Sequence, residues 1–595
     1  MRVVTLSKLF SLIFVAIIFS TVSNASNSQK PNIIIVITDD QGKNDLACEG
    51  NPYIITPNID KFYENAVRFT NYHVSTTCAP TRGALMTGRH TNRLNVFHTI
   101  SGRSLLFEDE VLLPQVLAQN GYVNGMFGKW HLGDNYPFRP MDRGFHTSVR
   151  HGGGGITQGP DYWGNDYFDD TYWHNGVLKA HKGYCTDVFF NEALDFIENN
   201  KDNPFFCYIS TNAPHGPLNC PEEYIDLYKD KDIPERYQRF YGMITNIDDN
   251  FKILQDKLHE WGLTENTIVI FTTDNGTAGG HNMYDAGMTG GKGSVTEGGH
   301  RVPFYIQWPA GGLAGGKDIG QLTAHYDVLP TLVDLIDLKY TPVKPLDGKS
   351  LGPLLDEKLV NWPNRVLYMD TQREQNLVKY KKYTVMDKDW RLVDGDKLYN
   401  VTNDLKQEYN VIDQYPGVAE RLALGYEKWW QSLVDEGVNE KYAYIKVGTQ
   451  YENPSRLMSH DMMTGKPGRS WHQFGAIEAA QATGIWKVQF VETGQYKISL
   501  RRFARESGLK INATFPTAEK ERRIDRQAPA SEKSDFSSAY LYVGKHHLTR
   551  KIKGDEEEIT FKVDMAEGKY NIEAQLIDEL GRVHPAYYLY IEKLQ

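Results

Sequence analysis

Four short apolar runs constrain the fold of this chain more than any other feature. Each is followed within a few positions by polar side chains. The runs lie at residues 33–37, 122–127, 205–209 and 268–271. Such runs are typical of strands that are buried on both faces, as in parallel sheets. Because helical patterns lie between them, at 193–199 and 250–262, we predict an α/β fold with a mostly parallel sheet flanked by helices.

The polar side chains that follow these runs predict a site. The carboxyl ends of parallel strands meet at one edge of a sheet, and ligands bind there. One polar residue after one strand would be an ordinary loop residue, but four strands share the design. We therefore expect convergence of Asp39, Asp40, Lys129, His131, His215, Asp274 and Asn275.

The pattern of apolar residues changes twice in the rest of the chain. Residues 389–411 alternate as short strands, and 417–437 have the apolar spacing of an amphipathic helix. In the tail, 484–503 and 557–577 each show two alternating strands around a glycine-containing turn, which predicts antiparallel hairpins. We predict a signal peptide over 1–25, an α/β domain over 26–360, a small α+β subdomain over 361–440 and a β-sandwich-like tail over 441–595.

The N-terminus predicts export. Arg2 and Lys8 flank the start of an apolar segment at 9–19, and Ser23-Asn24-Ala25 fits a small-x-small cleavage site. A membrane anchor is the alternative, but the apolar run is short for a bilayer span. We expect an exported protein, periplasmic or secreted, without stable membrane insertion after the signal peptide is cleaved.

Charge and cysteine content narrow the function further. The formal net charge of −10 argues against nucleic-acid binding, which needs a basic face. Export permits disulfides. The odd number of cysteines leaves at least one thiol unpaired, and the pairing of the others stays open. They are Cys48, Cys78, Cys185, Cys207 and Cys220.

Cys78 opens the stretch CAPTRGALMTGR, which predicts a short helix. Pro80 suits the first turn of a helix, where a missing N–H costs nothing. Cys78 would then lie at a helix N-terminus, where backbone N–H groups and the helix dipole favour an anion. Arg82 would lie one turn on, near the same point. The arrangement suits the binding and attack of an anionic group.

The polar residues that follow the strands could bind a metal ion, hold an anionic substrate and transfer protons. Three carboxylates and an amide, without a pair of Cys or His ligands, suit Ca²⁺ or Mg²⁺ better than Zn²⁺. Lys129, and Lys292 in a glycine-rich loop, offer positive charges to anionic oxygens. His131 and His215 are candidates for general acid and base.

Residues 78–82, with Thr87-Gly88-Arg89 after them, resemble the maturation signature C-x-P-x-R of the type I, formylglycine-dependent sulfatases. Thr81 stands where that family often has Ser. The resemblance extends over 30–440 and includes Gly-Lys-Trp-His-Leu-Gly, Ala-Pro-His and Thr-Asp-Asn-Gly. It implies an alkaline-phosphatase-like fold, with 361–440 as its C-terminal subdomain. It implies nothing about the tail.

The resemblance also implies a mechanism and its residues. A maturation enzyme would oxidise Cys78 to formylglycine, whose hydrate attacks a sulfate ester. One Ca²⁺, in preference to Mg²⁺, would be bound by Asp39, Asp40, Asp274, Asn275 and the modified Cys78. Arg82 and Lys129 would hold the formylglycine, His131 would take a proton from it, His215 would protonate the leaving oxygen, and Lys129 and Lys292 would bind sulfate.

The stretch 150–176 is rich in glycine and then in aromatic, Asp and Asn residues, as in sugar-binding pockets. A long surface loop that is held by its own aromatics is the alternative. We predict that His98, His151, Trp163 and Asn165 line a substrate pocket. From the family, we expect a sulfated carbohydrate as substrate, with algal glycans such as ulvan or carrageenan ahead of host glycosaminoglycans.

Two other functions fit parts of the pattern. A phosphonate or phosphate monoester hydrolase of the same superfold could use the same sheet and metal carboxylates. A non-catalytic carbohydrate-binding protein could carry an unmodified Cys78 and bind sugar through its β-rich tail. The filled set of catalytic positions argues against the second alternative.

Overall fold

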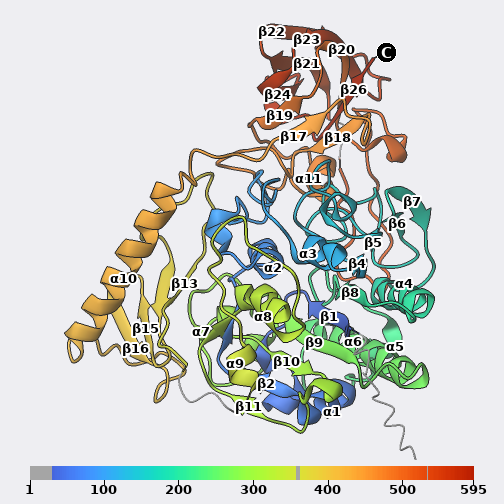
Figure 1. Cartoon of the computed structure of the whole chain (residues 1–595). Helices are drawn as coiled ribbons and strands as arrows, with labels where there is room; N and C mark the ends of the chain where they lie inside the picture. The colour runs from blue at the N-terminus through green and yellow to red at the C-terminus, as the bar shows by residue number, and fades with distance from the viewer. Residues whose placement is uncertain (1–29, 357–361, 532–533, 595) are drawn as a thin grey trace, which may run out of the picture.

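The computed structural model describes residues 30–356, 362–531 and 534–594. The predicted signal peptide lies outside the described residues. Figure 1 shows a large layered body, a small sheet with a long helix at its left, and a β-rich tail at its top. No helix in the described ranges has the length and apolar character that a membrane span requires.

The central sheet is built around the four predicted strands. They are β1 (Asn32–Thr38), β4 (Val123–Gly128), β8 (Phe205–Ser210) and β9 (Thr267–Thr273). They lie in the order β9-β1-β8-β4 and all pair in parallel, with Ile35 of β1 opposite both Ile270 and Tyr208. Their carboxyl ends therefore lie on one edge of the sheet, as the sequence predicts.

Shorter strands extend this core on both sides. On one side β10 (Phe304–Gln307) pairs antiparallel with β9, followed by β2 (Val67–Phe69) and β11 (Asp318–Ile319). On the other side β5 (Thr147–Arg150) pairs in parallel with β4, followed by β6 (Thr171–His174) and β7 (Val177–Ala180). The predicted α/β fold with a mostly parallel sheet is confirmed at its centre.

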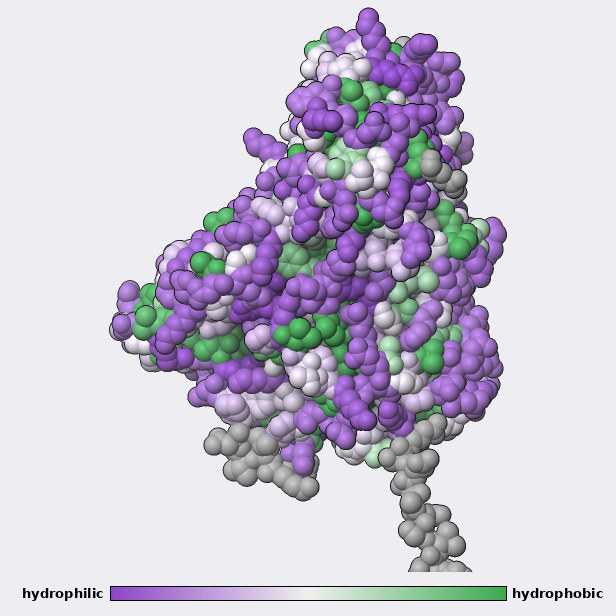
Figure 2. All heavy atoms as spheres, turned by 45° about the horizontal axis from the view of Figure 1, so that its top comes forward, coloured by the Kyte–Doolittle hydropathy of each residue, from purple (hydrophilic) through white to green (hydrophobic). Residues whose placement is uncertain are grey.

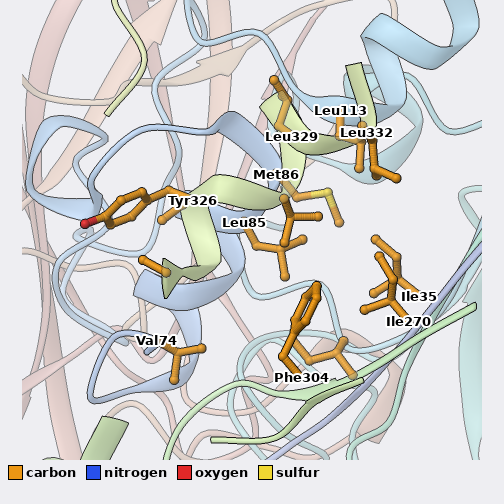
Figure 3. Packing of buried hydrophobic residues seen from close by; sticks show 14 of the residues in the cluster. Ile35, Val74, Leu85, Met86, Leu113, Ile270, Phe304, Tyr326, Leu329 and Leu332 are labelled. Atoms are coloured by element: carbon orange, nitrogen blue, oxygen red, sulfur yellow. The ribbon is translucent and has the colours of Figure 1, made fainter. Parts of the chain in front are cut away.

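Both faces of the sheet are covered by helices. Ile33, Ile35 and Ile37 face a cluster built with α2 (Cys78–Thr87), α3 (Leu113–Gln119) and α8 (Val328–Leu335). Figure 3 shows Leu85, Met86 and Leu329 of this cluster near Ile35 and Ile270. Ile34 and Val36 face a second cluster with α1 (Pro57–Asn65), α4 (Cys185–Asn200) and α6 (Glu235–Glu260). Successive side chains of β1 thus enter opposite cores, which explains its unbroken apolar run.

A four-stranded antiparallel sheet follows the central body. Its strands, in order, are β13 (Leu367–Asp370), β14 (Tyr383–Met386), β15 (Trp390–Val393) and β16 (Lys397–Asn400). The amphipathic helix α10 (Pro416–Asp435) packs Leu422, Tyr426 and Trp429 onto Val385 and Leu392 of this sheet. The strands and the helix that the sequence predicts here are both present.

The tail consists of two sheets that enclose one core. One has the order β17 (Ile445–Val447), β19 (Trp486–Phe490), β24 (Gly568–Asp578), β21 (Phe536–Val543) and β22 (His546–Lys551), and β25 (Val583–Pro585) pairs with β24. The other has the order β18 (Ser455–Met458), β26 (Tyr588–Lys593), β20 (Gly494–Arg501) and β23 (Ile559–Met565). Trp486, Val488, Ile498 and Leu500 belong to the shared core.

The two predicted hairpins of the tail are wrong. β19 and β20 follow each other in the chain but lie in different sheets, and so do β23 and β24. Alternating apolar residues show only that one face of a strand is buried. In a sandwich both sheets bury one face in the same core, so the pattern cannot tell a hairpin from a crossing between sheets. Hairpins form instead between β21 and β22, with Val543 opposite His546, and between β24 and β25, with Ile577 opposite Val583.

Within the described residues the cysteines form no disulfide, and the face seen in Figure 2 is mostly hydrophilic. All five cysteines, which lie within the described residues, are free thiols. In the view of Figure 2, hydrophilic side chains cover most of the surface, and hydrophobic ones form small, separate patches. Scattered patches of this kind are normal on globular proteins.

Candidate active site

The polar residues at the strand ends meet in three ion pairs. Asp39 and Asp40 follow β1, Lys129 follows β4, and Asp274 follows β9. Lys129 Nζ lies 2.6 Å from Asp39 Oδ2, and Lys292 Nζ lies 2.5 Å from Asp40 Oδ1. The third pair joins Arg82 to Asp274. The topology of the parallel sheet thus brings together side chains that are up to 253 positions apart in the sequence.

The pair between Arg82 and Asp274 is completely buried. Arg82 Nε and Nη2 donate to Asp274 Oδ2 at 3.0 and 2.7 Å. Arg82 also donates to the Lys129 carbonyl and to the Ser210 hydroxyl. Burial alone would lower the pKa of the guanidinium, but the charge of Asp274 raises it above its ordinary value. Arg82 therefore fixes the position of Asp274 beneath the cluster.

Cys78 is the first residue of α2 and is buried, as the sequence predicts. Its Sγ lies 3.4 Å from Nδ1 of His131. On the other side of that ring, Nε2 lies 2.8 Å from the Thr99 carbonyl. A carbonyl oxygen only accepts, so Nε2 carries the proton and Nδ1 presents its lone pair to Cys78. Burial, with the charge of Lys129, lowers the pKa of His131 and keeps the ring neutral.

His215 lies beside Asp40 and is partly exposed. Its Nδ1 donates to the Gly216 carbonyl at 2.7 Å, and its Nε2 lies 3.8 Å from Asp40 Oδ2. Burial and the charges of Lys292 and Lys129 outweigh that of Asp40 and lower the pKa of His215 to about 3. Both ring orientations therefore direct one free nitrogen toward the cluster.

The donor set fits a hard divalent cation. The carboxylate of Asp39, the thiol of Cys78 and the carboxylate of Asp274 each offer one atom, and these atoms lie within 4.8 Å of one another. Asp39 Oδ1 and Asn275 Oδ1 are buried without a hydrogen-bond partner among the described residues. Asn275 Nδ2 donates to Asp40 Oδ1, which leaves the amide oxygen free for a cation. Buried oxygens without donors are what a cation site requires.

The carboxylates differ in their electrostatic environment. Burial raises the pKa of Asp39 above its ordinary value, and burial with the charge of Asp39 raises the pKa of Asp274 to about 6. Burial acts in the same direction on Asp40, but the charge of Lys292 and its hydrogen bond outweigh it, so the pKa of Asp40 lies below its ordinary value. Three carboxylates this close repel one another, and a bound cation would relieve that repulsion.

A cavity of about 530 Å³ opens next to this cluster. Asp40 and His215 line its inner part, and Arg236, Tyr237 and Phe240 of α6 line one side. The tail supplies another part of the wall, through Trp471, His472, Phe474, Asp525 and Arg526. A larger cavity, of about 1040 Å³, lies elsewhere between the central sheet and the tail, with walls that include Tyr136, Arg150 and Tyr451. The smaller cavity is therefore the one that leads to the reactive cluster.

The four predicted pocket residues do not line this cavity. Trp163 packs against Phe503 and Tyr588 of the tail, and the Asn165 amide bonds to Asp161 and to the backbone of Thr171. Trp163 thus packs between the two parts of the protein, and contact of either residue with a substrate stays a prediction.

His98 and His151 lie nearer to the cluster but are also turned inward. His98 Nδ1 accepts from the backbone N–H groups of Thr99 and Ile100, and so holds the loop whose carbonyl orients His131. His151 Nδ1 donates to the Gly152 carbonyl. These hydrogen bonds to the backbone suit a role in positioning the cluster rather than contact with a substrate.

The sequence prediction missed every contribution of the tail to the site. Besides the cavity wall, the ring of His460 lies 6.1 Å from the ring of His131, centroid to centroid. His460 is buried and its Nδ1 lies 2.8 Å from Asp461. No motif in the tail marks these residues, and only its docking on the central body brings them to the site.

A parallel sheet with this cluster at its carboxyl edge defines the alkaline-phosphatase-like fold. A family model described as Sulfatase matches residues 31–338, just over half of the chain. The chain therefore belongs to the sulfatase family, and the resemblance found in the sequence is confirmed.

Curated relatives agree with this assignment. The chain is 32% identical to human arylsulfatase A, with 55% of this chain and 68% of that protein covered. It is 30% identical to the N-acetylgalactosamine-6-sulfatase of Rattus norvegicus, covering 60% and 72%. The match to an arylsulfatase of Hemicentrotus pulcherrimus is also 30% identical and spans 55% of this chain but only 62% of that protein.

Solved structures show the same fold. Ps i-CgsB, in complex with k-i-k-neocarrahexaose, superposes with a TM-score of 0.62 at 27% identity, over 69% of this chain and 94% of the other. The PsFucS1 sulfatase from Pseudoalteromonas sp. gives 0.58 at 20% identity, over 70% and 93%. The second likeness, at this identity, concerns the fold alone.

Proposed function

We propose that this protein is a formylglycine-dependent sulfatase that removes sulfate from a sulfated carbohydrate. The observation that carries the proposal is the position of Cys78. It starts α2 inside a cluster of three carboxylates and two lysines, and its Sγ lies 3.4 Å from the free nitrogen of His131. A thiol that only fills a core would not need a base, two cations and unpaired metal-type oxygens around it.

The proposed cation ligands are Asp39, Asp40, Asp274, Asn275 and the modified Cys78. Their oxygens suit Ca²⁺ better than Mg²⁺, which prefers to keep several waters. When bound, such a cation lowers the pKa of a hydroxyl group near it and offsets the negative charge of sulfate. With the carboxylates engaged in this way, Lys129 and Lys292 become available to sulfate oxygens.

The proposed reaction starts from Cys78 after a maturation enzyme has oxidised its Cβ to an aldehyde, which adds water to form a geminal diol. One hydroxyl of the diol attacks sulfur, and the S–O bond to the alcohol breaks. His215 Nε2 gives a proton to the leaving oxygen. His131 Nδ1 then takes the proton of the second hydroxyl, the bond to sulfate breaks, and the aldehyde forms again.

The orientation of each imidazole supports its role. The Thr99 carbonyl holds the proton of His131 on Nε2, so Nδ1 is ready to accept one. His215 is neutral in this structure because its pKa is lowered to about 3. A general acid must carry a proton, so we propose that the negative charge of the bound sulfate ester offsets the lysine charges and raises the pKa of His215.

The carbohydrate assignment draws on the cavity and on the relatives. The cavity of about 530 Å³ is within the range of small-molecule sites and has an aromatic wall. One relative acts, by its name, on an N-acetylgalactosamine sulfate, and one solved neighbour holds a neocarrahexaose. We propose a sulfated glycan such as ulvan or carrageenan as substrate, and export to the periplasm or the medium through residues 1–25.

The test compares hydrolysis of 4-nitrophenyl sulfate and 4-nitrophenyl phosphate. Wild type and Cys78→Ala are assayed with and without a chelator, after peptide mass has shown that Cys78 is converted. Sulfate release that requires both Cys78 and a divalent cation is the expected result. If converted enzyme releases neither product, a panel of sulfated oligosaccharides is tested next, and failure on that panel contradicts the proposal.

The same assay separates the alternatives. A phosphonate monoester hydrolase from Agrobacterium radiobacter shares the fold, with a TM-score of 0.51 at 21% identity, so the fold cannot decide between sulfate and phosphorus esters. Faster release of phosphate than of sulfate would favour that activity. Binding of glycans without conversion of Cys78 and without turnover would favour a non-catalytic protein.

A further inference from the structure

The tail forms one wall of the reactive cavity, and this points to a recognition function. We propose that Arg526 of the tail, together with Arg236 of α6, binds a second anionic group of the carbohydrate, a carboxylate or a further sulfate. The inference rests on the proposed function, because it concerns the same cavity. It predicts a substrate with at least two acidic groups, one cleaved and one held.

The loop that carries Arg526 is fixed to the central body. The backbone N–H of Leu218 donates to Asp525 Oδ2 at 3.1 Å, and the N–H of Asp525 donates to Asn219 Oδ1 at 2.8 Å. The N–H of Cys220 donates to the Arg523 carbonyl at 3.0 Å. These bonds join the loop to the segment that directly follows His215. The backbone at Arg526 is therefore held at a defined place, next to the segment that follows His215.

A second tail segment closes the cavity wall and is equally well anchored. His472 Nε2 lies 2.9 Å from the Thr157 hydroxyl. Gln473 Nε2 donates to the backbone carbonyls of Gln158, Asp161 and Tyr162. Trp471 Nε1 donates to the Gly468 carbonyl, which holds its ring at the cavity. An indole ring held in this way offers an apolar face to a sugar ring.

Neither arginine pairs with a carboxylate within the described residues, although Arg236 Cζ lies 5.2 Å from the centroid of the Tyr237 ring. Arg526 and Arg236 form no hydrogen bond or ion pair within the described part of the chain, and both are exposed at the cavity. Their neighbours Arg522 and Arg239, by contrast, pair with Asp226 and Glu235. Arginine presents a planar fork of donors that matches carboxylates and sulfates. A free guanidinium at the wall of a substrate cavity is therefore a candidate anion site.

The remaining charges around the cavity do not cancel this site. Asp525 also lines the wall and keeps its negative charge, although its Oδ2 is engaged by the Leu218 N–H. Asp40 is paired with Lys292. Arg526 also acts at the wall, since its charge contributes, after burial and Arg469, to the lowered pKa of His472. With Asp40 offset by Lys292, two arginines face one carboxylate at the outer wall, so one positive charge is left for an incoming anion.

The test measures binding separately from turnover. The full-length chain with Cys78→Ala is titrated by calorimetry with a disulfated disaccharide and with its monosulfated analogue. The readout is the ratio of the two Kd values. We expect a tenfold or larger loss of preference for the disulfated sugar in Arg526→Ala, about 1.4 kcal/mol, because the variant lacks the charged donors that would bind the second anion.

Two further variants complete the design. Arg550→Ala, on β22 of the tail, is the matched control and should leave the ratio unchanged, since Arg550 pairs with Glu556 and does not line the cavity. Arg526→Lys should keep part of the preference, because it retains the charge but loses the fork. An unchanged ratio in Arg526→Ala overturns the inference, whether or not wild type turns over. If the ratio of Kd values depends on Arg526 but converted wild type shows no turnover, the anion site is supported and the sulfatase reaction is refuted.

Discussion

Substitution of Gly154 by alanine tests the position of His131 without touching a reactive group. A Cβ at position 154 would lie 2.2 Å from His131 Cε1 and 2.4 Å from Nε2. Carbon atoms normally approach to about 3.5–4.0 Å, so the ring must move by roughly 1 Å. That shift would break the contact of Nε2 with the Thr99 carbonyl and that of Nδ1 with Cys78.

The size of the effect follows from these two contacts. Loss of two hydrogen bonds costs about 1–3 kcal/mol of unfolding free energy. A reacting group displaced by about 1 Å can lose about 100-fold in rate. We therefore expect Gly154→Ala to fold with reduced stability and to lose about 100-fold in kcat on an aryl sulfate or on a sulfated oligosaccharide.

The assay measures kcat per converted active site, with formylglycine content taken from peptide mass, and urea unfolding of the same samples. The matched control is Gly417→Ala in α10, where an added Cβ meets nothing within 4 Å. Activity of Gly154→Ala within twofold of wild type, at equal conversion, would refute the placement of His131 as the base. A loss that the control shares would show that the effect is not local.

Four further outcomes follow from the structure. Chelation should abolish activity and Ca²⁺ should restore it. At a concentration 100 times its Kd, the cation should raise the free energy of unfolding by about 2.7 kcal/mol. Full activity in the presence of chelator would contradict the cation site. Arg82→Met should cost about 3–5 kcal/mol in urea unfolding, because it leaves the charge of Asp274 buried and unpaired; a loss below 1 kcal/mol would show that Asp274 is neutral. Trp163→Ala should lower the free energy of unfolding by roughly 2 kcal/mol, less than the loss for a fully buried Trp, and should change KM less than twofold. A higher KM at unchanged stability would instead indicate that Trp163 contacts the substrate. Burial raises the pKa of Glu452 from 4.5 to about 7, so ionisation of Glu452 is disfavoured in the folded state. Stability should therefore fall as pH rises from 4.5 to 7, and Glu452→Gln should reduce that fall when thermal unfolding is measured across this pH range.

The reactive cluster was largely predictable because each of its residues follows a strong local signal. Asp39, Lys129, His215 and Asp274 each follow a buried run, and parallel strands present their carboxyl ends at one edge. Cys78 begins a helix that its own sequence specifies. The roles of these residues in catalysis stay a prediction, but their convergence is a matter of topology that the apolar runs already imply.

The structure places the predicted pocket residues away from the cavity beside the cluster, because composition does not state what a side chain packs against. Trp163 lies in a stretch whose aromatic and amide residues are typical of sugar binding, yet its ring meets Phe503 of the tail. The hairpins failed for a related reason. Alternation reports burial of one face, and the partner strand is chosen by contacts far away in the chain.

The sequence by itself determined the parallel core, the edge where the polar groups meet and the helix that presents Cys78, since strand period, helix capping and chain order are local properties. Only the tertiary structure decided that the tail reaches the cavity. Trp471 and Arg526 lie more than 250 residues after His215 along the chain. Their position depends on which loops of the central body and of the tail dock together. That docking is set by shape, by apolar contacts such as Trp163 on Phe503, and by scattered hydrogen bonds, which leave no period or motif in the sequence.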